Sequence, residues 1–142
     1  MSTLKKAIAI ATAAHKSTVD KYGAPYFHHV NRVMEMGKTT DEKILGVLHD
    51  VVEDTKWTFK QLEKEGFSKK IIAALKCVTK TSDAEDYEAF INRIVKNKLA
   101  IKVKLNDLFD NMDIRRMDKV RSKDIKRLNK YLKAHKKLSA LI

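Results

Sequence analysis

The sequence predicts an all-α fold, and three observations support that prediction. Only one proline and four glycines occur among the 142 residues, so few positions interrupt a helix. Apolar residues recur three and four positions apart along most of the chain. They do not alternate with polar residues over any useful length, as they would in a half-buried strand. A chain of this length can bury one core, so we expect a compact single-domain bundle over residues 1–142 with about seven helices.

The first half of the chain contains three predicted helices. The first covers residues 4–16, and the turn Tyr22-Gly23-Ala24-Pro25 separates it from a second helix over residues 27–36. Thr39, with a glutamate three residues later, has the spacing of a capping box and opens the third helix. We expect this helix to continue through an apolar run into the charged stretch 48–55.

Further helices fill the second half. Thr58 with Gln61 repeats the capping-box spacing, and Ser68 is typical of a residue that opens a helix. The first of these helices is predicted to end at residue 65, where Gly66 stops it, and the second runs from Ser68 to about residue 78. The remaining ranges are about 84–97, 99–112, and residue 122 onward. The last helix has an apolar stripe made of Leu128, Tyr131, Leu132, His135, Leu138 and Ile142. We interpret His135 as a packed histidine rather than as a ligand.

The charged stretch Leu48-His49-Asp50-Val51-Val52-Glu53-Asp54-Thr55 follows residues that belong in a core. Burying charge is costly unless the charge is paired or bound to a metal. Residues four apart share a helix face, which predicts His49 above Glu53 and Asp50 above Asp54. One interpretation is a bound cation that compensates the acids. The other is a solvated helix end, which is less favourable because acids are better placed at a helix N-terminus.

A second polar cluster lies in the predicted helix over residues 99–112. Asp107 and Asn111 are four apart and share a face that differs from the apolar one. Two helices can therefore converge on one site, and a histidine from residues 27–36 can complete it. Mixed imidazole and carboxylate ligation suits Mn, Fe, Zn or Co.

The charge is strongly basic, with a formal net charge of +12. Residues 98–142 hold fourteen Lys and Arg against five Asp, or +9. Such a surface attracts nucleic acid, an acidic partner or a polyphosphorylated small molecule, unless it is simply a solvated helix face. No run of about 18 apolar residues exists, so we expect no membrane span. The N-terminus does not match a signal peptide and Cys77 has no partner, so we expect a cytoplasmic location.

Four separated motifs together resemble the hydrolase domain of RelA/SpoT homologues, which are HD-domain metal-dependent phosphohydrolases, in a single-domain form. The resemblance covers about residues 7–117. The motifs are Ala14-His15 with Gly23-x-Pro25-Tyr26-x-x-His29, Leu48 to Thr55, Val78-Thr79-Lys80, and Lys104-Leu105-x-Asp107-x-x-x-Asn111-Met112. The resemblance implies a helical bundle of HD-domain type.

The resemblance also implies roles for individual residues. One divalent metal, usually manganese (Mn²⁺), is held by His29, His49, Asp50 and Asp107. His28 is the rival of His29 as a ligand, but neighbouring helical residues point about 100° apart. Glu53 and Asp54 are the catalytic residues that orient and deprotonate the attacking water. The substrate-binding residues are Lys21, Thr79, Lys80 and Asn111. The implied reaction is hydrolysis of the 3′-pyrophosphate of guanosine 3′,5′-bis(diphosphate), or (p)ppGpp, by a metal-activated water.

The chain departs from the family pattern where the base is recognised. Ser17-Thr18-Val19-Asp20-Lys21 replaces Gly-Gln-x-Arg-Lys, Met112-Asp113-Ile114 replaces Met-Arg-Thr, and Val30 replaces a proline. Two alternatives therefore stay open: an HD-type phosphatase acting on another phosphorylated nucleotide, and a basic helical module that binds nucleic acid. The second lacks an aromatic-interleaved or recognition-helix pattern. Metal analysis separates them, because a binding module should contain no stoichiometric Mn, Fe or Zn.

Overall fold

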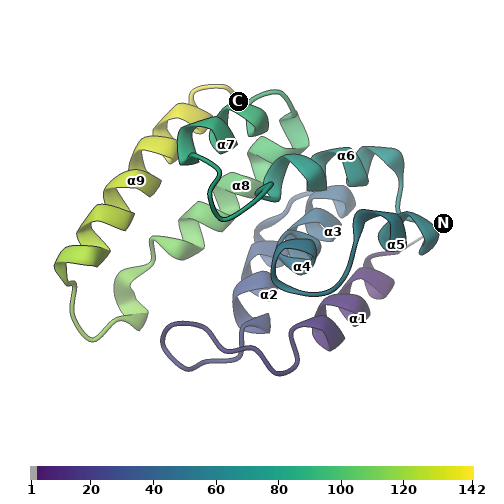
Figure 1. Cartoon of the computed structure of the whole chain (residues 1–142), viewed down its shortest axis with the longest axis horizontal. Helices are drawn as coiled ribbons and strands as arrows, with labels where there is room; N and C mark the ends of the chain where they lie inside the picture. The colour runs from purple at the N-terminus through teal and green to yellow at the C-terminus, as the bar shows by residue number, and fades with distance from the viewer. Residues whose placement is uncertain (1–2) are drawn as a thin grey trace.

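The computed structural model describes residues 3–142, and within this range helices joined by turns and loops make up the fold (Figure 1). The elements are α1 (Leu4–Ala14), α2 (Phe27–Met36), α3 (Thr40–Leu48), α4 (Val51–Asp54), α5 (Phe59–Lys64), α6 (Lys69–Val78), α7 (Tyr87–Ile94), α8 (Lys98–Asn111), the 3₁₀-helix η1 (Ile114–Arg116) and α9 (Ser122–Ser139). Between residues 3 and 142 the only β-type pairing is one isolated bridge, Val19 with Pro25. The predicted all-α class is confirmed.

Side-chain caps set where several helices begin, as the sequence indicates. The Thr39 hydroxyl accepts a hydrogen bond from the backbone N–H of Glu42 at the start of α3. Thr58 and Gln61 form a reciprocal capping box at the start of α5. The Ser68 hydroxyl accepts a hydrogen bond from the backbone N–H of Ile71 at the start of α6. Each cap satisfies N–H groups that have no partner within the helix.

The expectation of one continuous helix through residues 48–55 is wrong. Helix α3 ends at Leu48, His49 and Asp50 form a turn, and α4 is a separate short helix. The cause is a local competition for a carbonyl oxygen. The imidazole Nδ1 of His49 donates to the Gly46 carbonyl oxygen at 2.6 Å, and the amide of Asp50 would use that same oxygen if the helix continued.

Helix α3 lies in the middle of the bundle and packs against α1, α2, α6 and α8 (Figure 1). Its buried residues Leu45, Val47 and Leu48 are fully enclosed. Gly46 allows the close approach of α2, because a Cβ there would lie 3.1 Å from the Cα of Met34. The C-terminal end of α3 is therefore held firmly against α2 at the point where the charged residues begin.

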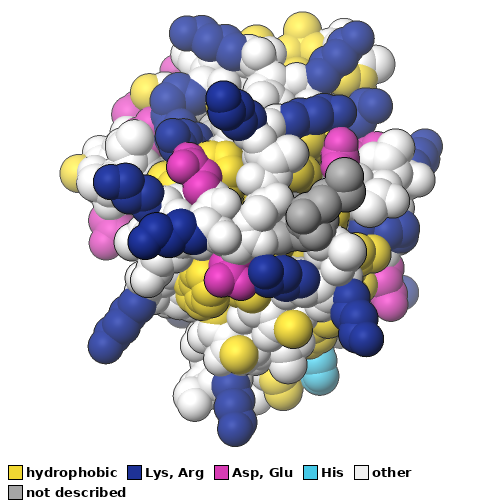
Figure 2. Space-filling view, turned by 90° about the vertical axis from the view of Figure 1, so that its right-hand side faces the viewer, with side chains coloured by type: hydrophobic (Ala, Val, Ile, Leu, Met, Phe, Trp, Pro, Cys, Tyr) yellow, Lys and Arg dark blue, Asp and Glu magenta, His cyan; other side chains and the backbone are white. Residues whose placement is uncertain are grey.

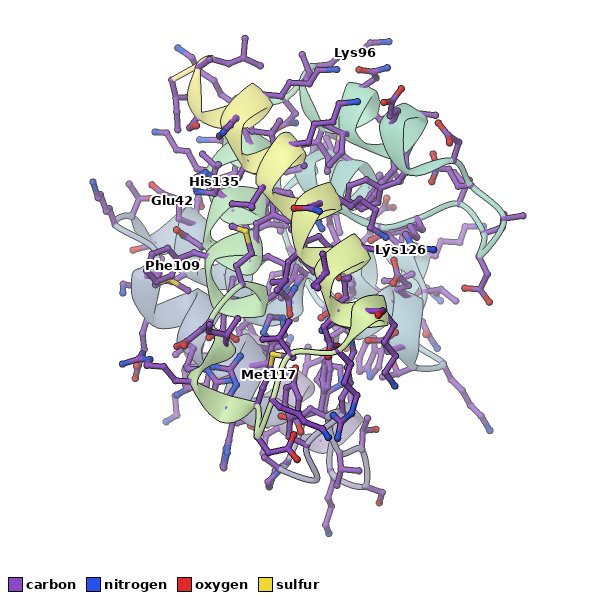
Figure 3. The ribbon with its side chains drawn as sticks, turned by 90° about the vertical axis from the view of Figure 1, so that its left-hand side faces the viewer. Glu42, Lys96, Phe109, Met117, Lys126 and His135 are labelled. Atoms are coloured by element: carbon purple, nitrogen blue, oxygen red, sulfur yellow. The ribbon has the colours of Figure 1, made fainter. Side chains whose placement is uncertain are left out.

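Helix α9 packs on α8 at the edge of the bundle, with a narrower buried face than the sequence predicts (Figure 3). Ala134 and Leu138 are buried, whereas Leu132 is 46% exposed and Ile142 is 57% exposed. The predicted stripe is thus wrong for Leu132, because a spacing of three and four residues admits two adjacent stripes. It is also wrong for Ile142, because α9 ends at Ser139. Half-buried His135 lies on the side of α9 that is next to α8.

Basic side chains are spread over the surface. Figure 2 shows the side of the molecule where α1, α5 and α6 lie, and Lys and Arg side chains are scattered over all of it. Within residues 3–142, no helix is both long enough and apolar enough to cross a membrane.

Candidate functional site

Four of the predicted side chains meet at one point between three elements. His29 comes from α2, His49 and Asp50 from the turn after α3, and Asp107 from α8. The possible ligand atoms of His29, His49 and Asp50 lie within 4.8 Å of one another. Asp107 completes the group, because its Oδ1 lies 3.0 Å from Nε2 of His29 and 3.3 Å from Nε2 of His49.

In both histidines, a hydrogen bond at Nδ1 fixes the orientation of the ring. Nδ1 of His49 bonds to the Gly46 carbonyl oxygen at 2.6 Å, and Nδ1 of His29 bonds to Oδ2 of Asp110 at 2.7 Å. In each case an oxygen accepts, so Nδ1 donates its proton. Both Nε2 atoms are then directed at Asp50 and Asp107, as in metal sites where a second hydrogen bond orients the ligand.

The cluster concentrates charge in a buried place. Burial alone would lower the pKa of His29, but its hydrogen bonds to Asp107 and Asp110 raise that pKa to about 9. Burial would raise the pKa of Asp107, but the Lys104 ammonium group and His49 hold it well below its ordinary value.

These side chains fit a metal ion. Nε2 of His49 is buried and has no hydrogen-bond partner of good geometry within the described part of the chain. Two imidazoles and two carboxylates form a mixed donor set that suits a divalent transition-metal ion, which would take the place of the protons on the histidines. The structure thus contains a candidate His–Asp metal site.

Tyr26 forms a wall beside this cluster. Its hydroxyl donates to Oδ2 of Asp50 at 2.5 Å, and its ring contacts those of His15 and His29. His15 is only 1% exposed, and neither of its ring nitrogens has a hydrogen-bond partner among residues 3–142. His15 therefore supports Tyr26 by packing.

A cavity of about 350 Å³ opens in front of the cluster. Asp50, Asp107 and His29 form part of its wall. Seven cationic side chains also line it: Lys21, Arg32, Lys80, Lys104, Arg116, Arg127 and Lys130. Four of these (Lys104, Arg116, Arg127 and Lys130) belong to the basic C-terminal region, so part of that positive charge faces the cavity. A basic cavity of this size is suited to a small anionic ligand.

The two predicted catalytic carboxylates are placed differently. Glu53 lines the cavity, and its Oε1 accepts a hydrogen bond of 2.9 Å from the backbone N–H of Lys80. Asp54 is exposed like Glu53, but it is absent from the cavity wall. Partial burial, together with the nearby charges of Asp50 and Glu53, raises the pKa of Asp54 to about 7.

The predicted substrate-binding residues also divide. Lys21, Lys80 and Asn111 line the cavity, and the Asn111 amide donates to Asp107 at 2.9 Å. Thr79 departs from the expectation, because its buried hydroxyl donates to the Leu75 carbonyl oxygen at 2.7 Å and is not part of the cavity wall. That hydroxyl satisfies a carbonyl at the end of α6 instead.

The interpretation of the sequence missed several residues of the site. Asp110 is 4% exposed and contacts His29, and Arg32 and Arg116 both contact Asp110. One signal was available, because Asp107 and Asp110 are three apart on α8 and so lie on neighbouring parts of one face. The rival ligand His28 is exposed, whereas His29 is buried.

The bundle gathers two histidines and two aspartates beside a basic cavity, which is the arrangement that the resemblance to HD-type domains implies. A solved structure has a similar fold: that of a metazoan ortholog of SpoT, described as hydrolysing ppGpp and playing a role in starvation responses. The two folds superpose with a TM-score of 0.81 at 22% sequence identity, over 97% of this chain and 85% of the other.

In sequence, the chain is similar to proteins described as (p)ppGpp hydrolases. The chain is 29% identical over 120 residues to the guanosine-3′,5′-bis(diphosphate) 3′-pyrophosphohydrolase of Aquifex aeolicus, covering 77% of this chain. It is 28% identical over 123 residues to the bifunctional (p)ppGpp synthase/hydrolase SpoT of Escherichia coli, again covering 77% of this chain. In both cases the chain spans only 17% of the relative's length. No protein-family profile matches the chain.

Proposed function

We propose that this chain is a metal-dependent phosphohydrolase that removes the 3′-pyrophosphate of (p)ppGpp. The observation that supports this most directly is the convergence of His29, His49, Asp50 and Asp107 at the wall of a basic cavity. The likeness to 3′-pyrophosphohydrolases in sequence, and to a SpoT ortholog in fold, supports the same reaction.

We assign a separate role in this reaction to each group of residues. His29, His49, Asp50 and Asp107 would hold one divalent ion, with Mn²⁺ as the first candidate. Such an ion supplies a water molecule whose pKa is lowered toward neutrality. Glu53 lines the cavity and is oriented by the Lys80 amide. It would accept the proton that this water releases.

Cationic side chains in the cavity wall would stabilise phosphate charge. Lys104 is placed for this, because it lines the cavity and its ammonium group lies 2.8 Å from Oδ2 of Asp107. Burial alone would lower the pKa of Lys104, but Asp107 raises it, so Lys104 stays charged. Lys21 and Lys80 line other parts of the wall. Charge fixed in advance around developing phosphate charge lowers the barrier.

A second candidate is an HD-type phosphatase that acts on another phosphorylated nucleotide. Asp20 stands where the family pattern has an arginine. The Asp20 carboxylate accepts hydrogen bonds from the backbone N–H groups of Tyr22 at 2.8 Å and Ala24 at 3.0 Å, so it shapes its own loop. That loop offers the base no guanidinium plane from position 20. A cytoplasmic location stays a prediction.

The test is a hydrolysis assay combined with metal analysis. Protein loaded with Mn²⁺ should release pyrophosphate from ppGpp and contain one equivalent of metal. His49→Ala should lose both, whereas the matched control His28→Ala should keep both because His28 is exposed.

The alternatives give different results in the same assay. Release of phosphate from another nucleotide, with ppGpp untouched, would favour the second candidate. A full equivalent of metal in His49→Ala would show that the site is misassigned. A protein without stoichiometric metal would favour the nucleic-acid-binding alternative.

A further inference from the structure

Asp110 is a buried carboxylate outside the proposed ligand set, and both of its oxygens are engaged. Oδ2 lies 2.7 Å from Nδ1 of His29, and Oδ1 accepts from Nε of Arg32 at 2.7 Å. A second nitrogen of Arg32 lies 3.2 Å from Oδ2. Arg116 adds a charge contact of 3.5 Å to Oδ1 and donates to the backbone oxygen of Asp110 at 2.8 Å. The carboxylate is thus fixed between one imidazole and two guanidinium groups.

We propose that Asp110 is a positioning residue that orients His29 for metal binding, and that Arg32 and Arg116 hold Asp110 in place for this task. The inference rests on the proposed metal site. With Nδ1 donating to Asp110, Nε2 of His29 is left to face Asp50 and Asp107. Partners of this kind fix the ring orientation of a metal-binding histidine and increase its basicity.

The other histidine shows what the arrangement achieves. His49 is oriented in the same way, but its acceptor is the backbone carbonyl of Gly46, within the same turn. The corresponding backbone acceptor is not used by His29, whose Nδ1 points across to α8. Asp110 therefore does from a neighbouring helix what Gly46 does locally. Because Asp110 is a side chain, its contribution can be removed by substitution.

The contacts of Asp110 also indicate that it orients His29, in addition to stabilising the fold through its ion pair with Arg32. A buried ion pair with Arg32 needs no histidine, and a carboxylate can accept both arginine bonds with its two oxygens. Here Oδ2 makes its shortest contact with His29, at 2.7 Å, and the arginine contact to that oxygen is longer, at 3.2 Å. The geometry thus favours the imidazole at Oδ2 and the arginine at Oδ1.

The experiment measures Mn²⁺ affinity by titration calorimetry of metal-free protein, alongside thermal unfolding. Asp110→Ala should weaken Mn²⁺ binding by about 10–100-fold, the range found when such partners are lost. Asp110→Asn, which keeps an oxygen acceptor for Nδ1, should recover part of the affinity. In Co²⁺-loaded protein, the visible absorption spectrum of Asp110→Ala should change because a ligand has moved.

Glu42→Ala is the matched control. Glu42 is also a buried carboxylate, but it accepts from the Thr39 hydroxyl at 2.9 Å and the Lys38 amide at 3.3 Å, at the far end of α3. The Glu42→Ala variant should have a lower melting temperature and an unchanged Mn²⁺ affinity. Wild-type affinity in Asp110→Ala overturns the inference while the metal site stands, as does an equal loss in Glu42→Ala. If Asp110→Ala does not fold, Asp110→Leu, which fills the space but offers no acceptor to Nδ1, takes its place, and unchanged affinity and Co²⁺ spectrum in that variant overturn the inference. A wild-type protein that binds no Mn²⁺ overturns both the inference and the proposed function.

Discussion

Glu53 and Asp54 are adjacent in the sequence, but they face different surroundings. Both side chains are exposed, but Glu53 lines the cavity and is oriented by the Lys80 amide, whereas Asp54 is not part of the cavity wall. A residue that takes a proton from water at the metal must reach that water directly. The geometry therefore favours Glu53 as the base.

Glu53→Gln should lower kcat by about 10²–10⁴-fold, because the amide keeps the size of the side chain but cannot accept a proton. Bound Mn²⁺ and the melting temperature should stay close to wild type. Asp54→Asn is the control, with a much smaller expected loss. Turnover and metal content should be measured on the same preparation. Near-wild-type turnover in Glu53→Gln would remove the catalytic assignment.

At the residue scale, the candidate ligands could be predicted from the sequence, because they occur in the order and spacing of the motifs. His29, His49, Asp50 and Asp107 were named from the sequence and lie together in the structure, although metal binding by them stays a prediction. The sequence was less informative about supporting residues. Asp110 contacts His29 only because α2 and α8 pack together, and spacing within one helix does not reveal that contact.

One element with a defined electrostatic role is the connection between α6 and α7. Arg93 on α7 donates to the carbonyl oxygens of Lys76 and Thr79, both at 2.9 Å, and its Nε lies 2.8 Å from Oε2 of Glu85. These bonds satisfy carbonyls at the end of α6 and fix the polar loop over residues 79–86, which contains Lys80. The loop is thus held in a defined shape beside the cavity.

This loop should make stability depend on pH. Hydrogen bonds from Arg93 lower the pKa of Glu85 from 4.5 to about 2. A carboxyl whose pKa is lower in the folded state stabilises the protein fully above its unfolded pKa, and that contribution is lost as the pH falls toward the folded value. The melting-temperature difference between wild type and Glu85→Gln should therefore be large at pH 6 and smaller at pH 3.

The matched control is Glu88→Gln, on the first turn of α7. Glu88 pairs with Lys133 at 2.9 Å, but the two side chains are 70% and 78% exposed, and such pairs contribute little. It should leave the melting temperature nearly unchanged at both pH values. A constant difference for Glu85→Gln between pH 6 and pH 3 would contradict the linkage.

Elements were predicted well where local signals decide. The caps at Thr39, Thr58 and Ser68 mark true helix starts, because capping needs only neighbouring residues. The break after Leu48 was not predicted, because it depends on the direction of one imidazole. The buried face of α9 was only partly predicted, because the packing against α8 decides it.

At the scale of the whole molecule, positive charge exceeds negative charge by +12, and part of the excess surrounds the cavity. Burial and the nearby charges of Lys80, Lys104 and Arg127 lower the pKa of Lys130, which shows how closely these cations gather. A field of this kind increases the rate at which a polyanion reaches the site.

The value of kcat/KM for ppGpp should therefore fall as salt rises, because the screening length shortens from about 10 Å at 0.1 M to about 3 Å at 1 M. Lys130→Ala should lower kcat/KM at low salt and weaken the salt dependence. Lys64→Ala, which removes an exposed charge on α5, is the matched control and should behave like wild type. A kcat/KM that does not change with salt would place the basic charge outside the binding step.

The candidate ligands come from α2, from the turn after α3 and from α8, and these segments lie together only when the bundle is complete. An unfolded chain would hold them far apart and bind an ion weakly. By mass action, an ion that binds only the assembled form adds RT ln(1 + [L]/Kd) to the free energy of unfolding, about 2.7 kcal/mol at a hundredfold excess over Kd. The supply of metal would then determine how long the protein survives as well as how fast it works, and chelation would remove both together.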